Sequence, residues 1–226
     1  MFFVSLGIPP TCLSALRSRV GEVKLLPPFA RLQSGVASHA DMLLFPTDRG
    51  LIVHGEYFDA NKALFDGVNV ITAEGKAAPD YPNDILLNAL DAGEGRLISL
   101  TERTDGRIKA LYKTHIRVRQ GYTRCSCAKV GNGFITSDRG IFAALRSNGV
   151  PSLLIRPGYV RLPGYDTGFI GGASVWLSGT ETAFFGDVTR HPDYSEMAAF
   201  ARDMGAALVP LSDGELTDIG GAVEVK

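Results

Sequence analysis

Short apolar runs alternate with tight-turn residues along the whole chain, and the order of elements that they predict repeats. In the clearest unit, Asp138 is placed to cap a helix and Asn148-Gly149 to end it. The elements of this unit are a strand ending near Val130, a Gly131-Asn132-Gly133 hairpin turn, a strand over 134–136, a helix over 139–147 and a strand over 152–155. The pattern therefore predicts the order strand, strand, helix, strand.

The same order is predicted elsewhere in the chain. The second unit has strands over 41–45, 51–53 and 68–72 and a helix over 59–65. The third has strands near 85–90, 96–100 and 116–118 and a basic helix around 105–113. The fifth has strands around 169–177, 183–185 and 207–211 and a helix over 192–204. The segments that open these units start at Asp41, Asp84, Cys125 and Gly168, which are 43, 41 and 43 residues apart. Such regular spacing indicates an internal repeat of about 42 residues.

The first unit lacks an opening strand, and the end of the chain offers one. Residues 2–25 predict a strand over 2–6, a helix over 11–20 and a strand over 22–25. Ile219-Gly220-Gly221-Ala222 repeats Ile170-Gly171-Gly172-Ala173 and is followed by the strand-like Val223-Glu224-Val225. We expect this last strand to pair beside Phe2–Leu6, which closes a ring of five units and removes two free sheet edges.

Composition supports one globular domain over residues 1–226. Of the 226 residues, 45% are hydrophobic and 21% charged, which excludes a disordered chain, a coiled coil and a collagen-like repeat. A chain of this mass should expose roughly 10,000 Å² when folded. The formal net charge of -1 argues against a general electrostatic grip on nucleic acid or anionic lipid.

The same sequence predicts a cytoplasmic protein without cofactor or metal. No apolar run approaches the roughly 18 residues that span a bilayer, and MFFVSLGIPP lacks the basic start of a signal peptide. Cys12, Cys125 and Cys127 are an odd number without framework spacing, so we expect reduced thiols. The Cys-x-Cys pair supplies only two of the four ligands of a structural zinc ion, so we expect no metal site.

Five strand-strand-helix-strand units with a closing strand resemble the pentein fold, the α/β propeller of the guanidino-group modifying enzymes. That superfamily includes amidinotransferases, deiminases, dimethylarginine dimethylaminohydrolases and a non-catalytic ribosome anti-association factor. Within it, an uncharacterised bacterial branch is similar in four segments: Ser38-His39-Ala40-Asp41-Met42, Gly121-Tyr122-Thr123-Arg124-Cys125-Ser126, 162–172 and 213–221. The resemblance implies an α/β fold with five propeller blades over the whole chain.

The resemblance also implies where chemistry would occur. In the superfamily enzymes a Cys attacks a guanidinium carbon, a His transfers protons, and carboxylates bind the planar cation through paired hydrogen bonds. Here the catalytic candidates are Cys125, His39 and Asp84, and the substrate-binding candidates are Asp41, Asp166, Asp218 and Arg124. Cys125 would attack an amidine or guanidine carbon, His39 would shuttle protons, and Asp84 with Asp41 would orient the cation.

The chain departs from the superfamily at one diagnostic point. The enzymes carry their nucleophile just after the last Gly-rich turn, where this chain has Ala222, Val223 and Glu224. The alternative is therefore a non-catalytic binding module on the same scaffold. The stretch 107–124, which holds six basic and no acidic residues, would then contact a ribosome or RNA.

Each candidate also has an ordinary structural interpretation, and both interpretations stay open at this point. A small buried strand residue is the commoner role of a free Cys such as Cys125, and His39 also fits a loop imidazole that binds backbone groups. The aspartates are common turn caps. Lys109 and Lys113 lie one turn apart, as expected on a solvated helix face.

Overall fold

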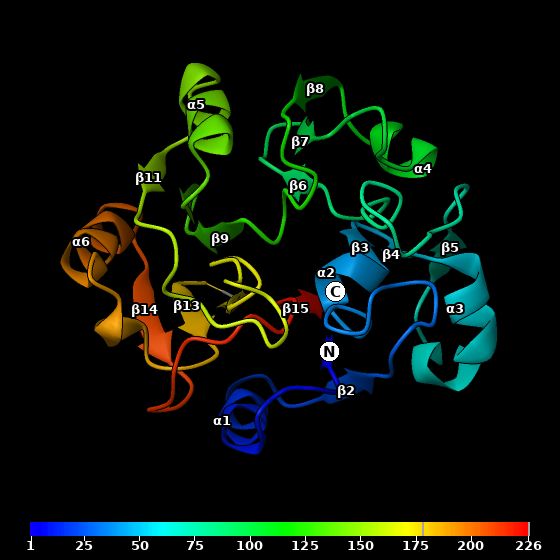
Figure 1. Ribbon diagram of the computed structural model, residues 1–226, viewed down its shortest axis with the longest axis horizontal. Coiled ribbons are helices and arrows are strands. Elements are labelled where there is room, and N and C mark those ends of the chain that lie inside the picture. Colours follow the sequence, from blue (N-terminus) through cyan, green and yellow to red (C-terminus); the bar gives the residue numbers. More distant parts are fainter. Residues whose placement is uncertain (178, 226) are drawn as a thin grey trace.

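The computed structural model describes residues 1–177 and 179–225, whose strands form five three-stranded open sheets around a common centre (Figure 1). The sheets are β15(Ala222–Glu224)-β1(Phe2–Ser5)-β2(Val23–Leu26), β3(Leu44–Thr47)-β4(Gly50–Val53)-β5(Val70–Thr72), β6(Leu90–Asp91)-β7(Arg96–Ser99)-β8(Thr114–Arg117), β9(Cys127–Val130)-β10(Gly133–Thr136)-β11(Ser152–Leu154) and β12(Ser174–Leu177)-β13(Glu181–Phe184)-β14(Ala207–Pro210). The fold is mixed α/β.

Every sheet follows one pairing rule. Its central strand pairs antiparallel with one neighbour and parallel with a strand that the chain reaches after a helical segment. The antiparallel neighbour is joined by a hairpin in four sheets and is the C-terminal strand in the first. These helical segments lie outside the ring of sheets and are α1(Pro10–Val20), α3(Gly55–Ala60) with the 3-10 turn η1(Lys62–Phe65), α4(Gly106–Lys109), α5(Arg139–Ser147), and η2(Val188–Arg190) with α6(Tyr194–Asp203). The order strand, strand, helix, strand predicted from the sequence is confirmed.

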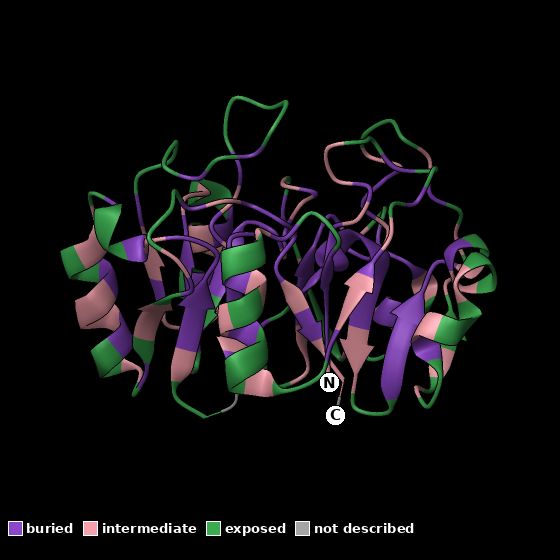
Figure 2. Ribbon diagram, turned by 90° about the horizontal axis from the view of Figure 1, so that it is seen from below, coloured by how far each residue is buried: buried purple, intermediate pink, exposed green. Residues whose placement is uncertain are grey.

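The C-terminal strand completes the first sheet, as predicted. β15 pairs antiparallel with β1, with Val223 opposite Phe3, and both side chains are fully buried in one apolar cluster. The amino group of Met1 lies 3.4 Å from the carbonyl oxygen of Val225, so the two ends of the chain meet (Figure 2).

The pairing rule gives the molecule two unlike faces. The hairpin turns, such as 47–50 and 130–133, lie at one end of the sheets, which we call the hairpin face. The connections from one sheet to the next lie at the other end, the loop face, and include the long segments 27–39, 73–89 and 155–173. Exposed loops rise on the side opposite to the chain termini in Figure 2.

The segments that open the units are turns, where the sequence predicted the start of a strand. Residues 40–43 form the short helix α2(Ala40–Leu43), so the strand predicted over 41–45 begins only at Leu44. Turns also precede β6, β9 and β12, and they shorten the strands predicted near 85–90 and around 169–177. The reason is that a short buried apolar run has the same pattern in a strand and in a helical turn.

Two helices have other bounds than the sequence predicts, and the first begins at Gly55, before its predicted start. The helix predicted over 59–65 is divided at Asn61, whose side-chain amide donates to the carbonyl of Tyr57, 2.9 Å away. The basic helix predicted around 105–113 covers only 106–109, because the amides of Lys113 and Thr114 turn to donate to the carbonyl of Gly95. By contrast, the helix over 139–147 is confirmed, and Asp138 Oδ1 caps it by accepting from the amide of Ile141.

Apolar packing between the sheets and the outer helices forms the core. Buried residues on the inner side of the helices, such as Leu16 of α1 and Leu145 of α5, pack on the strands, while the outer side of each helix is exposed (Figure 2). The exposed surface is 10200 Å². This agrees with the roughly 10,000 Å² expected for a folded chain of this mass.

The packing of the closing strand leads to a prediction about the stability of the fold. Val223→Ala should lower the free energy of unfolding by about 2 kcal/mol, because it removes two buried methyl groups opposite Phe3. Leu6→Ala is the matched control just beyond the end of β1, since Leu6 is 54% exposed and its loss should change stability by less than about 0.5 kcal/mol. Urea unfolding of both variants tests the prediction, and equal effects would contradict it.

Candidate functional site

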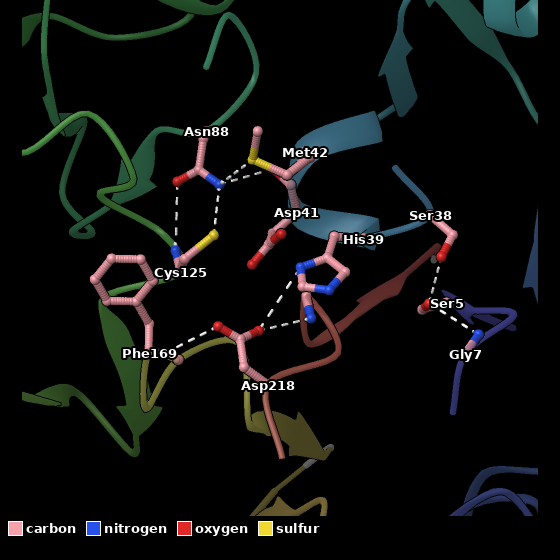
Figure 3. A network of polar contacts seen from close by, with 12 residues as sticks. Ser5, Gly7, Ser38, His39, Asp41, Met42, Asn88, Cys125, Phe169 and Asp218 are labelled. Carbon is pink, nitrogen blue, oxygen red and sulfur yellow. Dashed lines mark hydrogen bonds and ion pairs between the residues drawn. The ribbon is translucent and has the colours of Figure 1, made fainter. Parts of the chain in front are cut away.

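Four of the predicted residues meet at the centre of the molecule on the loop-face side. His39, Asp41, Cys125 and Asp218 are each at most 4% exposed, and their side chains point toward one another (Figure 3). They come from the segments that precede β3, β9 and β15, three strands that belong to different sheets. The internal repeat therefore brings residues distant in sequence to one place, as predicted.

Cys125 is held by a residue that the sequence analysis missed. The amide nitrogen of Asn88 lies 2.8 Å from Cys125 Sγ, and Asn88 Oδ1 accepts the backbone amides of Arg124 and Cys125 at 2.9 and 3.3 Å. Asn88 precedes β6 just as Cys125 precedes β9. An N–H donor directed at sulfur stabilises a thiolate over a thiol, so this contact favours a nucleophile.

Asp218 is the anchor on the opposite side of the cluster. Its two carboxylate oxygens accept the backbone amides of Phe169 and Gly220, each at 2.9 Å, and His39 Nδ1 lies 3.7 Å from Oδ1. Gly220 has φ 76°, and a Cβ atom there would collide with the side chain of His39. The glycine therefore permits the close approach of His39 to the last turn of the chain.

Burial sets the protonation of the cluster. Desolvation first, and then the charge of Asp41, raise the pKa of Asp218 to about 7. The same two causes, with the charge of Asp218, raise the pKa of the Cys125 thiol well above its ordinary value. Burial lowers the pKa of His39, against the attraction of Asp41, so the imidazole is neutral at neutral pH.

The cluster lacks positive charge. Asp41 Oδ1 is buried and has no hydrogen-bond partner among the described residues. No Lys or Arg of the described chain lies within 4.0 Å of the carboxylates of Asp41 or Asp218. Two buried carboxylates, a thiol and a neutral imidazole therefore form a site whose chemistry suits a small cation with several N–H donors.

The structure does not place Asp84 in this cluster, in contrast to the sequence prediction. Asp84 is buried, but its Oδ2 accepts the hydroxyl of Tyr122 at 2.6 Å, and its Oδ1 has no partner in the described chain. The ring of Tyr122 packs at a tilt of 36° against that of Phe169, whose backbone amide donates to Asp218. Asp84 therefore reaches the cluster only through Tyr122, because it precedes β6 by six positions, more than Asn88 does.

Asp166 and Arg124 are also placed elsewhere. Asp166 is exposed on the loop over 155–173, and within the described structure it makes no hydrogen bond or ion pair with the cluster. Arg124 turns away from the thiol that follows it and donates to the carbonyls of Leu44 and Ala222 at 3.1 and 3.3 Å. Neither position was readable from the sequence, because both residues lie in irregular segments where side chains do not alternate.

Loops from three units cover the cluster on the loop face. Tyr165 Oη donates to Gln33 Oε1 at 2.9 Å, and Gln33 Nε2 donates to the carbonyl of Pro79 at 2.9 Å. The rings of Tyr81, Tyr122 and Phe169 pack in a row, each tilted by 36° to the next, with centroids 5.4 and 5.9 Å apart. These contacts explain why Cys125 is only 3% exposed.

Three further features concern metal ligands, the basic stretch and membrane-spanning helices. Among the described residues, no group of three His, Cys, Asp or Glu side chains is arranged to hold a metal ion. In the basic stretch over 107–124, Arg117 pairs with Glu102, and Arg124 is turned inward, so the six cations do not act as one free surface. No described helix is both long and apolar enough to cross a membrane.

The fold is similar to that of dimethylarginine dimethylaminohydrolase. A structure of the Pseudomonas aeruginosa enzyme in complex with citrulline covers 94% of this chain and 91% of its own, with a TM-score of 0.59 and 10% identity. A structure of such an enzyme as an adduct with S-methyl-L-thiocitrulline covers 94% and 92%, with a TM-score of 0.58 and 10% identity. A structure of the enzyme as an adduct with 4-chloro-2-hydroxymethylpyridine covers 94% of this chain and 92% of its own, with a TM-score of 0.56 and 9% identity.

At 9% to 10% identity, these matches show a shared fold and do not show a shared activity. No curated protein matches the sequence at a significant level. The sequence profile of a family of unknown function, DUF6873, matches residues 3–223, which is nearly the whole chain. The protein therefore belongs to the DUF6873 family.

Proposed function

We propose that the chain binds a small amidinium or guanidinium cation between Asp41 and Asp218, and that Cys125 attacks its central carbon. The observation that carries the proposal is the unpartnered Oδ1 of Asp41, buried beside a thiol and a second carboxylate with no cation in contact. A planar cation supplies both the missing charge and the missing donors. In this proposal the five sheets are the blades of a five-bladed α/β propeller, and the site lies on its axis.

Each side chain has a role in the proposed reaction. Cys125 Sγ forms a bond to the amidine or guanidine carbon, and a C–N bond then breaks to release ammonia or an amine. His39 accepts the thiol proton and returns it to the leaving nitrogen. Water then adds to the carbon, the S–C bond breaks, and the thiol is regenerated with an amide or a urea as product.

The substrate itself activates the thiol in this scheme. In the site without a cation, burial and the charges of Asp41 and Asp218 raise the pKa of Cys125 and disfavour the thiolate. A bound cation neutralises those charges and so lowers the thiol pKa. The Asn88 amide, 2.8 Å from the sulfur, then stabilises the thiolate that forms. Reactivity is therefore coupled to the presence of a cation.

Asp84 acts through another residue in the proposed site. Its carboxylate holds the Tyr122 hydroxyl at 2.6 Å, and the Tyr122 ring packs against Phe169 beside the cluster. We assign Asp84 as a positioning residue for this aromatic wall. The orientation of the cation, which the sequence attributed to Asp84 with Asp41, falls in this proposal to Asp218 with Asp41.

The comparisons support a ligand of this class. Dimethylarginine dimethylaminohydrolase, which has the same fold, has been seen in complex with citrulline and as an adduct with S-methyl-L-thiocitrulline. The present chain differs in having Ala222, Val223 and Glu224 after its last Gly-rich turn. Its thiol comes instead from the segment before β9, so the proposed nucleophile has a different origin in the repeat.

A binding module without catalysis is the second candidate for the same cluster. It is favoured by the raised thiol pKa and by the cover of the three loops. Such a protein would hold the cation and leave its C–N bonds intact. The labelling experiment below separates these candidates, because only a thiol aligned with the bound cation reacts preferentially with a cationic probe.

The first prediction concerns thiol labelling. 2-Chloroacetamidine should alkylate Cys125 at least tenfold faster than neutral 2-chloroacetamide, because the cation is concentrated beside Asp41 and lowers the thiol pKa. Mass spectrometry of peptides gives the rate at each cysteine, and Cys12, which is buried elsewhere, is the internal control. Equal rates for both probes, or labelling confined to Cys12 and Cys127, would reject the nucleophile.

The second prediction is that a substitution at Asp41 abolishes the preference for the cationic probe. Asp41→Asn removes a buried negative charge that raises the pKa of Cys125, so neutral 2-chloroacetamide should react faster with the variant than with the natural chain. The cationic probe should lose its advantage in the same variant. A matched control is Asp166→Asn on the exposed loop, which should alter neither rate. A slower reaction of both probes with Asp41→Asn would count against this account.

The third prediction is a pH dependence. Because the pKa of Asp218 is raised to about 7, its carboxylate is mostly protonated at pH 6 and mostly ionised at pH 8. Acetamidinium, which stays charged throughout, should therefore bind roughly tenfold more tightly at pH 8 than at pH 6. Calorimetric titration measures the affinity, and neutral acetamide is the control. An affinity for acetamidinium that does not change over this range would be inconsistent with Asp218 as a ligand.

A further inference from the structure

A cavity opens on the hairpin face of the molecule. It has a volume of about 1390 Å³, and its rim is formed by hairpin turns that include residues 47–49, 93–96 and 131–132. Its inner end is formed by residues that precede the inner strands, among them Asp41 and Arg124. The cavity therefore runs along the centre of the ring from the hairpin face to the back of the Cys125 cluster. We call it the hairpin-face cleft.

Arg124 is held in a fixed orientation at the inner end of this cleft. Its two terminal nitrogens donate to the carbonyls of Leu44 and Ala222, at 3.1 and 3.3 Å. These acceptors belong to two different sheets, so the guanidinium is anchored on both sides. A guanidinium has five N–H groups, and only these two bonds to protein acceptors are found in the described chain. Donors therefore remain for a ligand in the cleft.

The charge of Arg124 is also unpaired. No carboxylate of the described residues lies within 4.0 Å of its nitrogens. By contrast, several exposed arginines of the chain have a carboxylate partner, among them Arg19 with Glu181, Arg31 with Glu56, Arg117 with Glu102 and Arg156 with Asp193. Burial lowers the pKa of Arg124, which shows that its charge is poorly solvated. A partly buried guanidinium with free donors and no counter-ion is suited to an anion.

We propose that Arg124 binds an anionic oxygen group, a carboxylate or a phosphate, at the inner end of the hairpin-face cleft. The rim carries charges of both signs, including Asp48, Arg49, Glu94 and Arg96, so its net attraction for an anion is small. Recognition then rests on Arg124. The site adjoins the proposed cation site and shares Asp41 with it, but Arg124 lines the cleft, whereas Cys125 contacts Asn88 inside the cluster.

Asp41 should make anion binding respond in opposite directions to substitutions at Asp41 and at Arg124. Asp41 also lines the inner end of the cleft, and its charge attracts Arg124. It therefore repels an anion bound to Arg124. Removing the charge of Asp41 should tighten anion binding, whereas removing the charge of Arg124 should weaken it. General damage to the fold would weaken binding in both variants, so the opposite signs distinguish a site from an unstable protein.

Calorimetric titration with sodium phosphate and, separately, sodium acetate tests the site at pH 7 and constant ionic strength. We expect saturable binding of one ion per chain for at least one of the two anions, and the anion that binds identifies the class. Arg124→Gln should weaken it tenfold or more, and Asp41→Asn should strengthen it. Arg49→Gln on the rim should change the affinity for the anion less than twofold. Cys125→Ser should leave this affinity unchanged, so anion binding can be tested independently of the proposed thiol chemistry.

Two outcomes would overturn the inference. One is no binding of either anion to the natural chain. The other is equal weakening by Arg124→Gln and Arg49→Gln, which would show a diffuse attraction by the rim. If Arg124→Gln does not fold, Arg124→Lys retains the charge but lacks the planar pair of donors, so it should still weaken binding at least threefold. Unchanged affinity in Arg124→Lys would then contradict the assigned role.

Discussion

The pairing of β15 with β1 is the contact on which the centre of the molecule depends. It brings the last turn of the chain, 218–221, against the segment that opens the second unit. The amide of Asp41 donates to the carbonyl of Gly220 at 3.1 Å, and the side chain of His39 packs on Gly220 itself. Without this closure, Asp218 would have no fixed position relative to His39 and Asp41. The strand that completes the fold therefore also completes the polar cluster.

A deficit of positive charge gives this cluster its chemical character. Burial makes the ionised forms of Asp218 and Cys125 costly, and the charge of Asp41 adds to that cost. The guanidinium of Arg124 donates to backbone carbonyls and makes no contact with these carboxylates within 4.0 Å. Asp218 belongs to the cluster on the loop-face side, Asp41 borders both the cluster and the cleft, and Arg124 lines the cleft. In the two proposals, each of these sites binds an ion of the opposite charge.

The repeat in the sequence predicted much of this arrangement. Equivalent positions at the starts of the units had to converge, and His39, Asp41, Cys125 and Asp218 do so. The closing role of Val223–Val225 followed from the same repeat. The predicted strand order is correct because hairpin and helix signals, such as Gly131-Asn132-Gly133 and Asp138, act locally.

Other features had no readable signal in one sequence. The unit starts are turns, so the two-residue alternation of strands could not tell that Arg124 and Cys125 face opposite sides. Asn88 was missed because an amide next to an apolar run carries no chemical signature, although its place before β6 matches that of Cys125 before β9. The partner of Asp84, Tyr122, lies 38 residues away and depends on packing.

A crystal structure of the protein soaked with acetamidinium at pH 8 tests the central claim most directly. The account predicts a planar cation between the carboxylates of Asp41 and Asp218, with its carbon facing Cys125 Sγ. A site that stays empty at saturating concentration, or a cation bound only outside the cluster, would contradict it.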